Sequence, residues 1–216
     1  MSSLDKSLSP AQLTRHLHQG LTELGLDPQS CPCEEYLQYI DLLAKWNRAY
    51  NLTGVRDRQR MIHAHVLDSL AALPYIRGNH CLDVGSGAGL PGFILALAQP
   101  DVEWTLLDSN GKKVRFLRQL LFEMKTGNVE IIHSRAEKFL SSVSYSSIIS
   151  RAFGSLSACY RAVEHLLHPG ARLLAMKGRV PDTELQEVAG WVKTVTIEEL
   201  HVPGIDAHRS LVLMER

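Results

Sequence analysis

The spacing of apolar residues differs between the two parts of the chain. Up to about residue 75, apolar side chains recur three or four positions apart, which is typical of amphipathic helices. The first helix is predicted to begin at Pro10, with Ser9 as its N-cap, and to end at Gly25. The apolar positions that predict this helix and two further ones are Leu13, Leu17, Leu21 and Leu24; Tyr36, Leu37, Ile40, Leu43 and Trp46; and Ile62, Val66 and Leu70.

From Cys81 onward, short apolar runs alternate with helical patterns. Strands are predicted over residues 81–84, 102–108, 129–133, 147–152, 171–178, 192–200 and 210–215. Helices are predicted between them, over residues 90–100, 109–127, 155–170 and 181–190. This alternation predicts βαβ units, and therefore an α/β fold with a doubly wound, mainly parallel, Rossmann-like sheet. We expect an antiparallel edge strand from the last two runs, a helical N-terminal extension (1–75) packed on the core, and a sheet domain (76–216).

The composition narrows the class of protein. Apolar residues make up 45% of the chain, and 23 basic residues balance 23 acidic ones, so no overall basic field indicates a nucleic-acid partner. The four cysteines form no CxxC pair and the ten histidines show no metal-ligand spacing, which predicts a reduced, cytoplasmic protein without a metal. No apolar stretch reaches the roughly 18 residues of a membrane span, and the chain shows no signal peptide.

The stretch CLDVGSGAGLPG, residues 81–92, predicts a ligand-binding loop between a strand and a helix. Gly85, Gly87 and Gly89 have no Cβ, so the backbone can turn sharply and a ligand can approach it closely. In the NAD fingerprint GxGxxG the third glycine would fall on Leu90, where a large side chain would obstruct the packing of helix on strand. The spacing D-x-G-x-G-x-G instead favours S-adenosylmethionine (SAM), with Asp83 accepting from the cofactor's amine directly or through water. NAD binding and a turn without any ligand are the alternatives.

Two further strand ends carry candidate ligand contacts. Asp108 ends the next strand, 19 residues after Gly89, where a carboxylate can accept hydrogen bonds from both ribose hydroxyls of NAD or SAM. An N-cap role is the alternative for Asp108, although Ser109 or Asn110 could fill it. Ala136 and Glu137 follow the strand 129–133, where in methyltransferases the loop lies against the adenine. Glu137 could equally be a solvated charge in the first turn of a helix.

Several segments together resemble one family, the glucose-inhibited division protein B family. They are KWNRAYNLTGVRD, HVLDSLAALPYI, LDVGSGAGLPGFILALAQP, LLDSNGKKVRFLRQL and ISRAFGSL, and the resemblance covers about residues 34–216. It implies a Rossmann-like SAM-dependent methyltransferase that modifies ring nitrogen 7 of a guanine in the 530 loop of bacterial 16S rRNA. Matched to the family, the SAM contacts fall on Gly85, Leu90, Ala136, Glu137 and Arg151, while Asp83, Gly87 and Asp108 are assigned from the fold.

The implied reaction asks little of acid–base side chains, because the guanine nitrogen already carries a lone pair. We expect catalysis by positioning, with Arg151 at the end of a strand orienting the guanine or binding a phosphate. Asp68 is a candidate carboxylate for stabilising the cationic product, with a salt-bridge or N-cap role as the alternative. Contacts to the RNA backbone are expected from local basic clusters that include Arg56, Lys112, Lys113, Arg115 and Lys177.

The expected partner is 16S rRNA or the small ribosomal subunit, the expected cofactor is SAM, and a monomer is expected. Three other functions remain open at this point. They are a methyltransferase acting on a small molecule or a protein, an NAD-dependent oxidoreductase, and a ribosome-binding module without activity.

Overall fold

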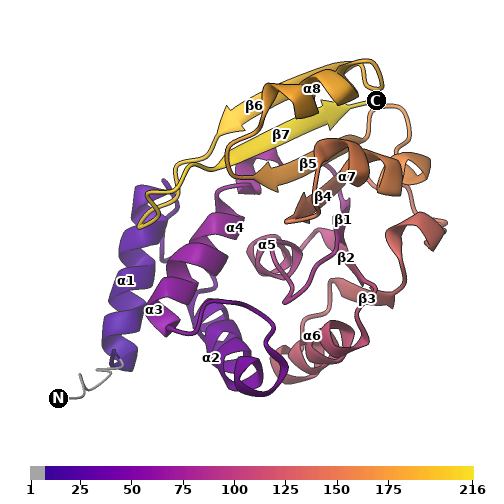
Figure 1. The fold of residues 1–216 in the computed structure, drawn as a ribbon. Coiled ribbons are helices and arrows are strands. Elements are labelled where there is room, and N and C mark those ends of the chain that lie inside the picture. Colours follow the sequence, from indigo (N-terminus) through magenta and orange to yellow (C-terminus); the bar gives the residue numbers. More distant parts are fainter. Residues whose placement is uncertain (1–7) are drawn as a thin grey trace.

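A computed structural model describes residues 8–216, which fold around one seven-stranded sheet (Figure 1). The strands lie in the order β3-β2-β1-β4-β5-β7-β6, and all pairings are parallel except those of β7 with β5 and with β6. The strands are β1 (His80–Val84), β2 (Glu103–Asp108), β3 (Val129–His133), β4 (Ser147–Arg151), β5 (Arg172–Lys177), β6 (Thr194–Glu199) and β7 (Ser210–Glu215). The predicted α/β class and the antiparallel pairing of the last two strands are confirmed.

The helices also follow the predicted pattern. The α-helices are α1 (Pro10–Glu23), α2 (Cys33–Tyr50), α3 (Arg58–Met61), α4 (Asp68–Leu70), α5 (Gly92–Ala98), α6 (Gly111–Met124), α7 (Leu156–Val163) and α8 (Asp182–Ala189). A π-helix, η1 (Ile62–Leu67), lies between α3 and α4, and 3₁₀ turns lie at η2 (Leu73–Tyr75), η3 (Ala136–Lys138) and η4 (Glu164–Leu166). The first helix begins as predicted, because Ser9 forms a capping box with Gln12.

The third predicted helix differs from expectation in its middle. The apolar positions Ile62, Val66 and Leu70 are spaced four apart and predict a regular helix, but residues 62–67 form a π-helix instead. Such wide turns depend on tertiary contacts rather than on apolar spacing, and they are frequent at functional sites. The carbonyl of Ala64 in this turn accepts a hydrogen bond from the distant Arg151, a contact that the local sequence does not reveal.

The two faces of the sheet are covered by different helices. Along β1, Cys81 packs into the cluster formed with the N-terminal helices, α5 and α6, whereas Leu82 and Val84 pack into the cluster formed with α7 and α8. This alternation follows from the two-residue period of a strand and gives three layers, as Figure 1 shows. The N-terminal helices share a hydrophobic core with the sheet, since Leu17 and Tyr39 are fully buried within it. The division at residues 75 and 76 stays a prediction.

Within residues 8–216, no helix has the length and apolar character needed to cross a membrane.

Gly92 sets how closely α5 approaches β1, and its replacement by alanine should therefore destabilise the fold. A Cβ on Gly92 would lie 2.5 Å from the Cβ of Asp83, a contact that neither backbone can relieve cheaply. We expect Gly92→Ala to lower the free energy of unfolding by about 1–3 kcal/mol in urea denaturation. Gly111→Ala is the matched control, because Gly111 also begins a helix and its Cβ would meet His133 at an ordinary 3.5 Å. Equal stability changes for the two variants would contradict the close-approach role of Gly92.

Candidate active site

The glycine loop, residues 85–92, joins the end of β1 to the start of α5. Gly85, Gly87 and Gly89 have φ angles of 72°, 60° and 86°, which residues other than glycine rarely adopt. Two carboxylates hold the loop from below. Asp108 Oδ2 accepts from the Gly87 N–H at 2.8 Å, and Asp83 Oδ2 accepts from the Gly92 N–H at 2.9 Å. The loop shape is therefore fixed at two points by the acidic ends of β1 and β2.

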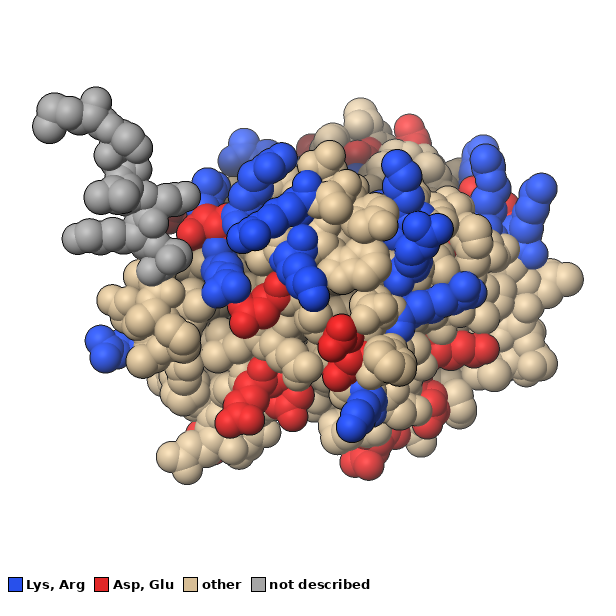
Figure 2. All heavy atoms as spheres, turned by 90° about the horizontal axis from the view of Figure 1, so that it is seen from below, with Lys and Arg blue, Asp and Glu red and all other residues tan. Residues whose placement is uncertain are grey.

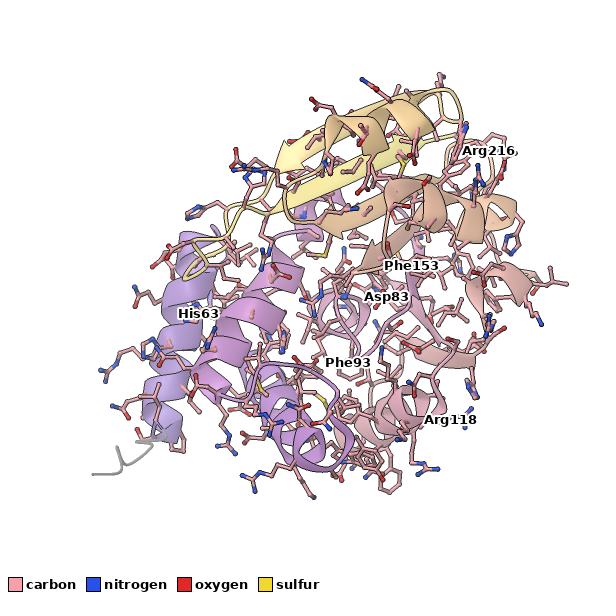
Figure 3. The ribbon with its side chains drawn as sticks, in the orientation of Figure 1. His63, Asp83, Phe93, Arg118, Phe153 and Arg216 are labelled. Carbon is pink, nitrogen blue, oxygen red and sulfur yellow. The ribbon has the colours of Figure 1, made fainter. Side chains whose placement is uncertain are left out.

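Asp83 lies in the interior of the molecule rather than on a cavity wall (Figure 3). Its side chain is fully buried, and its Oδ1 has no hydrogen-bond partner within residues 8–216. Burial raises the pKa of Asp83 to about 7, although the Gly92 N–H partly offsets this effect. The side chain of Leu90 is likewise buried in the core beneath the loop. Neither residue lines the two cavities described below, so the cofactor contacts assigned to them stay predictions.

A small cavity of about 150 Å³, here called the loop cavity, lies beside the glycine loop. Four of the predicted cofactor residues line it, namely Gly85, Asp108, Ala136 and Glu137. They meet there because the carboxyl ends of parallel strands lie at one edge of the sheet. Asp108 does not cap α6, because the Asn110 side chain accepts from the first turn of that helix and fills this role.

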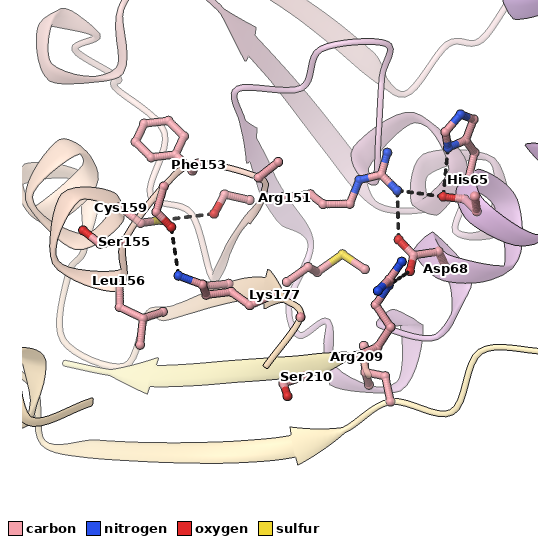
Figure 4. Close-up of a pocket in the computed structure, with 18 of the residues that line it drawn as sticks. His65, Asp68, Arg151, Phe153, Ser155, Leu156, Cys159, Lys177, Arg209 and Ser210 are labelled. Carbon is pink, nitrogen blue, oxygen red and sulfur yellow. Dashed lines mark hydrogen bonds and ion pairs between the residues drawn. The ribbon is translucent and has the colours of Figure 1, made fainter. Parts of the chain in front are cut away.

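A larger cavity of about 480 Å³, here called the strand-end cavity, lies beyond the ends of β4 and β5 (Figure 4). Its wall includes Arg151, Lys177 and Asp68 from the predicted residues, together with apolar side chains such as Leu156 and Met176. Phe153 lines both cavities, and its ring lies against Gly85, where an added Cβ would be 3.2 Å from it. The two cavities therefore adjoin at Phe153.

Asp68 joins two arginines at the wall of the strand-end cavity (Figure 4). Arg151 Nη1 donates to Asp68 Oδ2 at 2.8 Å and to the Ala64 carbonyl at 3.0 Å. Arg209 Nε donates to Asp68 Oδ1 at 2.8 Å. Both carboxylate oxygens of Asp68 are thus engaged. The sequence analysis missed Arg209, because the stretch before the last strand carried no signal beyond that of a loop.

His65 lies beside this cluster in a neutral state. Its Nε2 lies 2.9 Å from Thr53 Oγ1, and its Nδ1 lies 2.8 Å from the Ala64 carbonyl, so both ring nitrogens have partners. Burial, with the nearby Arg151 guanidinium, lowers the pKa of His65 to about 4. A neutral ring that donates through Nδ1 and accepts through Nε2 satisfies both contacts. His65 is therefore a structural link between the π-helix and the segment after α2.

The predicted RNA-binding residues fall into two groups. Arg56, Lys112 and Arg115 are exposed, and Lys113 is half-buried, with Nζ 3.8 Å from Asp108 Oδ2. Lys and Arg side chains gather on the face seen in Figure 2, the underside of Figure 1, where α2 and α6 lie. Lys177 differs from them in that it ends β5 and its Nζ has partners in the protein, since it pairs with Glu184 and donates to the Gly154 carbonyl at 2.9 Å. Its contact with RNA stays a prediction.

The residues of the loop cavity fit SAM by their chemistry. Open glycine backbone follows β1, a carboxylate ends β2, and a small alanine with a neighbouring glutamate follows β3, all on one cavity. With the strand order and the antiparallel β7, these features define a Rossmann-like SAM-dependent methyltransferase.

Comparisons with known proteins identify the family. A family model described as GidB, rRNA small subunit methyltransferase G, matches residues 32–212, and the chain belongs to this family. The Ribosomal RNA small subunit methyltransferase G of Legionella pneumophila is 44% identical over 198 residues, which cover 92% of each chain. The protein of the same name from Laribacter hongkongensis is 47% identical, over 93% of this chain and 97% of its own.

A solved structure supports the fold alone. A SAM dependent methyltransferase from Aquifex aeolicus superposes with a TM-score of 0.57 at 17% sequence identity, over 80% of this chain and 98% of its own. The predicted family and methyltransferase activity are confirmed by the family model and the named relatives.

The buried carboxylate of Asp83 should make stability depend on pH in a defined direction. Between about pH 4 and pH 7 the unfolded chain has lost the Asp83 proton, whereas the folded chain retains it. The stability of the wild-type protein relative to Asp83→Asn should therefore fall as pH rises through this window, by up to about 1.4 kcal/mol per pH unit, and level off above it.

Urea denaturation of both proteins at several pH values measures this difference. Asp101→Asn, which removes an exposed carboxylate in place of the buried one, is the control. If the stability of the wild type relative to Asp83→Asn stays constant or increases from pH 4 to pH 7, the raised pKa of Asp83 is contradicted.

Proposed function

We propose that the chain transfers a methyl group from SAM to ring nitrogen 7 of a guanine in the 530 loop of 16S rRNA. The observation that carries this proposal is the adjoining pair of cavities, one lined by four of the predicted cofactor residues and the other by Arg151 at the end of β4. Family membership supports the choice of rRNA as the substrate, because the related proteins are named for it. The larger cavity would take the guanine, and Phe153 lies where the two ligands would meet.

SAM, when bound, supplies a methyl group on a sulfonium that needs no further activation. Asp108 would bind the ribose hydroxyls, and Ala136 and Glu137 would lie against the adenine. The loop residues Gly85, Gly87 and Leu90, with Asp83 beneath them, would accommodate the methionine part. The guanine nitrogen attacks with its own lone pair, so no side chain has to remove a proton. The neutral, fully bonded His65 is consistent with this, since no free base faces the cavity from that position.

Arg151 is the residue that we assign to orienting the guanine. Its Nη1 is held by Asp68 and the Ala64 carbonyl, which fixes the guanidinium plane and leaves its other N–H groups for the substrate. A fixed donor that orients the guanine contributes to the rate by positioning, since the reacting atoms must be in line. Asp68 is engaged by two arginines, so positioning accounts for its place in the site better than direct stabilisation of the product charge.

The face that carries α2 and α6 is the proposed contact surface for the RNA backbone. Lys112, Lys113 and Arg115 lie on α6, and Arg56 donates to Asn51 at the end of α2, so these four residues would supply positive charge there. Lys177 would act closer to the strand-end cavity, which it lines. Local clusters of this kind bind phosphate even when the whole protein has no net charge. We propose that the protein acts as a monomer in the cytoplasm on the small ribosomal subunit.

Methyl transfer from labelled SAM tests the function directly. We expect label to enter 16S rRNA in small subunits from cells that lack this protein, at ring nitrogen 7 of one guanine in the 530 loop. Subunits from cells that contain the protein are the control and should accept little label, because the position is already methylated. Label that enters only small molecules or proteins from a panel would replace the RNA proposal. Binding of SAM without transfer to any acceptor would indicate a module without activity.

A further inference from the structure

The cluster of Arg151, Asp68 and Arg209 contains one residue to which no role has been assigned. Arg209 stands immediately before β7, and its guanidinium lines the strand-end cavity together with Arg151. Its partner Asp68 lies 141 residues earlier in the chain, and Asp68 lies 83 residues from Arg151. Three separate elements therefore bring their charges together at one wall of the cavity.

The charge balance of the cluster leaves one positive charge toward the cavity. The side chain of Asp68 is only 4% exposed and forms ion pairs with both guanidinium groups, whose side chains are 23% and 30% exposed. One carboxylate neutralises one of the two arginines. Because the two arginines share one carboxylate, both side chains are held in place, and the charge of neither is neutralised completely.

Arg209 also keeps hydrogen-bond donors for a ligand. Its Nε donates to Asp68 and its Nη1 donates to the His208 carbonyl at 3.1 Å, while Nη2 has no partner within residues 8–216. The backbone of Arg209 is held as well, because its carbonyl accepts from the Leu200 N–H at 2.8 Å. The guanidinium is thus fixed before any ligand arrives, which lowers the entropy that binding must overcome.

We propose that Arg209 binds the phosphate of the target nucleotide and that Asp68 is a positioning residue that holds Arg209 and Arg151 for the acceptor. This inference rests on the proposed function, since a guanine that enters the cavity as part of RNA brings a phosphate with it. A phosphate carries one negative charge per nucleotide linkage, which matches the remaining positive charge of the cluster. Guanidinium donors suit phosphate oxygens in both geometry and charge. The site would therefore favour a guanine within RNA over the free base.

Steady-state methylation of undermodified small subunits tests this proposal with four variants. Arg209→Gln should raise the KM for subunits about tenfold and change the Kd for SAM less than threefold. It should also reduce the slope of log KM against log salt concentration by about 0.7, the value for one phosphate contact on a single strand. Arg161→Gln is the matched control, since it removes an exposed arginine on α7 that lies over Trp191, and its KM and salt slope should equal those of wild type.

The double variant separates positioning from an independent role. Asp68→Asn should raise KM because it releases Arg209, and it should lower kcat because it releases Arg151. In Asp68→Asn combined with Arg209→Gln, KM should stay within twofold of that of Arg209→Gln alone, whereas independent roles would multiply the two increases. Thermal unfolding shows which variants fold, and if Asp68→Asn does not, the KM and salt slope of Arg209→Gln decide the matter.

Two outcomes would overturn the proposal in different ways. If wild type methylates subunits and Arg209→Gln has the KM and salt slope of wild type, the assignment of Arg209 is wrong while the proposed function stands. Multiplied KM increases in the double variant would overturn the positioning role of Asp68. If wild type methylates no RNA under any condition, the proposed function fails and this inference fails with it.

Discussion

Two buried carboxylates below the glycine loop determine the shape of the site. Three glycines at positive φ give the loop an open backbone, but they do not by themselves select one conformation. Asp83 and Asp108 select it by accepting from the N–H groups of Gly92 and Gly87. The cost is visible at Asp83, where burial raises the pKa of the carboxyl group, and one of its oxygens has no partner in the described part of the chain. The loop is therefore held in a shape that leaves Gly85 on the wall of the loop cavity, where a ligand can approach it.

The N-terminal helices are part of the site rather than a separate attachment. Tyr39 on α2 donates its hydroxyl to the Ala88 carbonyl of the glycine loop at 2.9 Å, and its ring stacks on Phe93 of α5. The Ala64 carbonyl of the π-helix and the Asp68 side chain of α4, the helix that follows it, hold Arg151 at the end of β4. The segment before the sheet thus supports the glycine loop and Arg151 at once. A change that loosens these helices should affect both.

The sequence was sufficient for the fold and for four candidate residues that the structure brings together. Strand ends that alternate with helices must meet at one edge of a parallel sheet, which is why Gly85, Asp108, Ala136 and Glu137 line one cavity as predicted. The contacts of Arg209 could not be predicted, because they join segments 141 residues apart and no local pattern records such a pairing. The π-helix escaped for a related reason, since a few apolar positions four residues apart do not distinguish the period of one wide turn from that of an α-helix. The sequence also does not show which basic residues form ion pairs within the protein, as Lys177 does with Glu184.

Titration of SAM into the wild-type protein and into Asp108→Asn tests the central claim that this carboxylate both holds the glycine loop and binds the cofactor. Asparagine keeps the size of the side chain but loses its charge and one of its two acceptor oxygens. We predict that the Kd for SAM rises at least about tenfold, equivalent to about 1.4 kcal/mol of binding free energy, while the protein stays folded. An unchanged Kd in a folded Asp108→Asn protein would contradict the account.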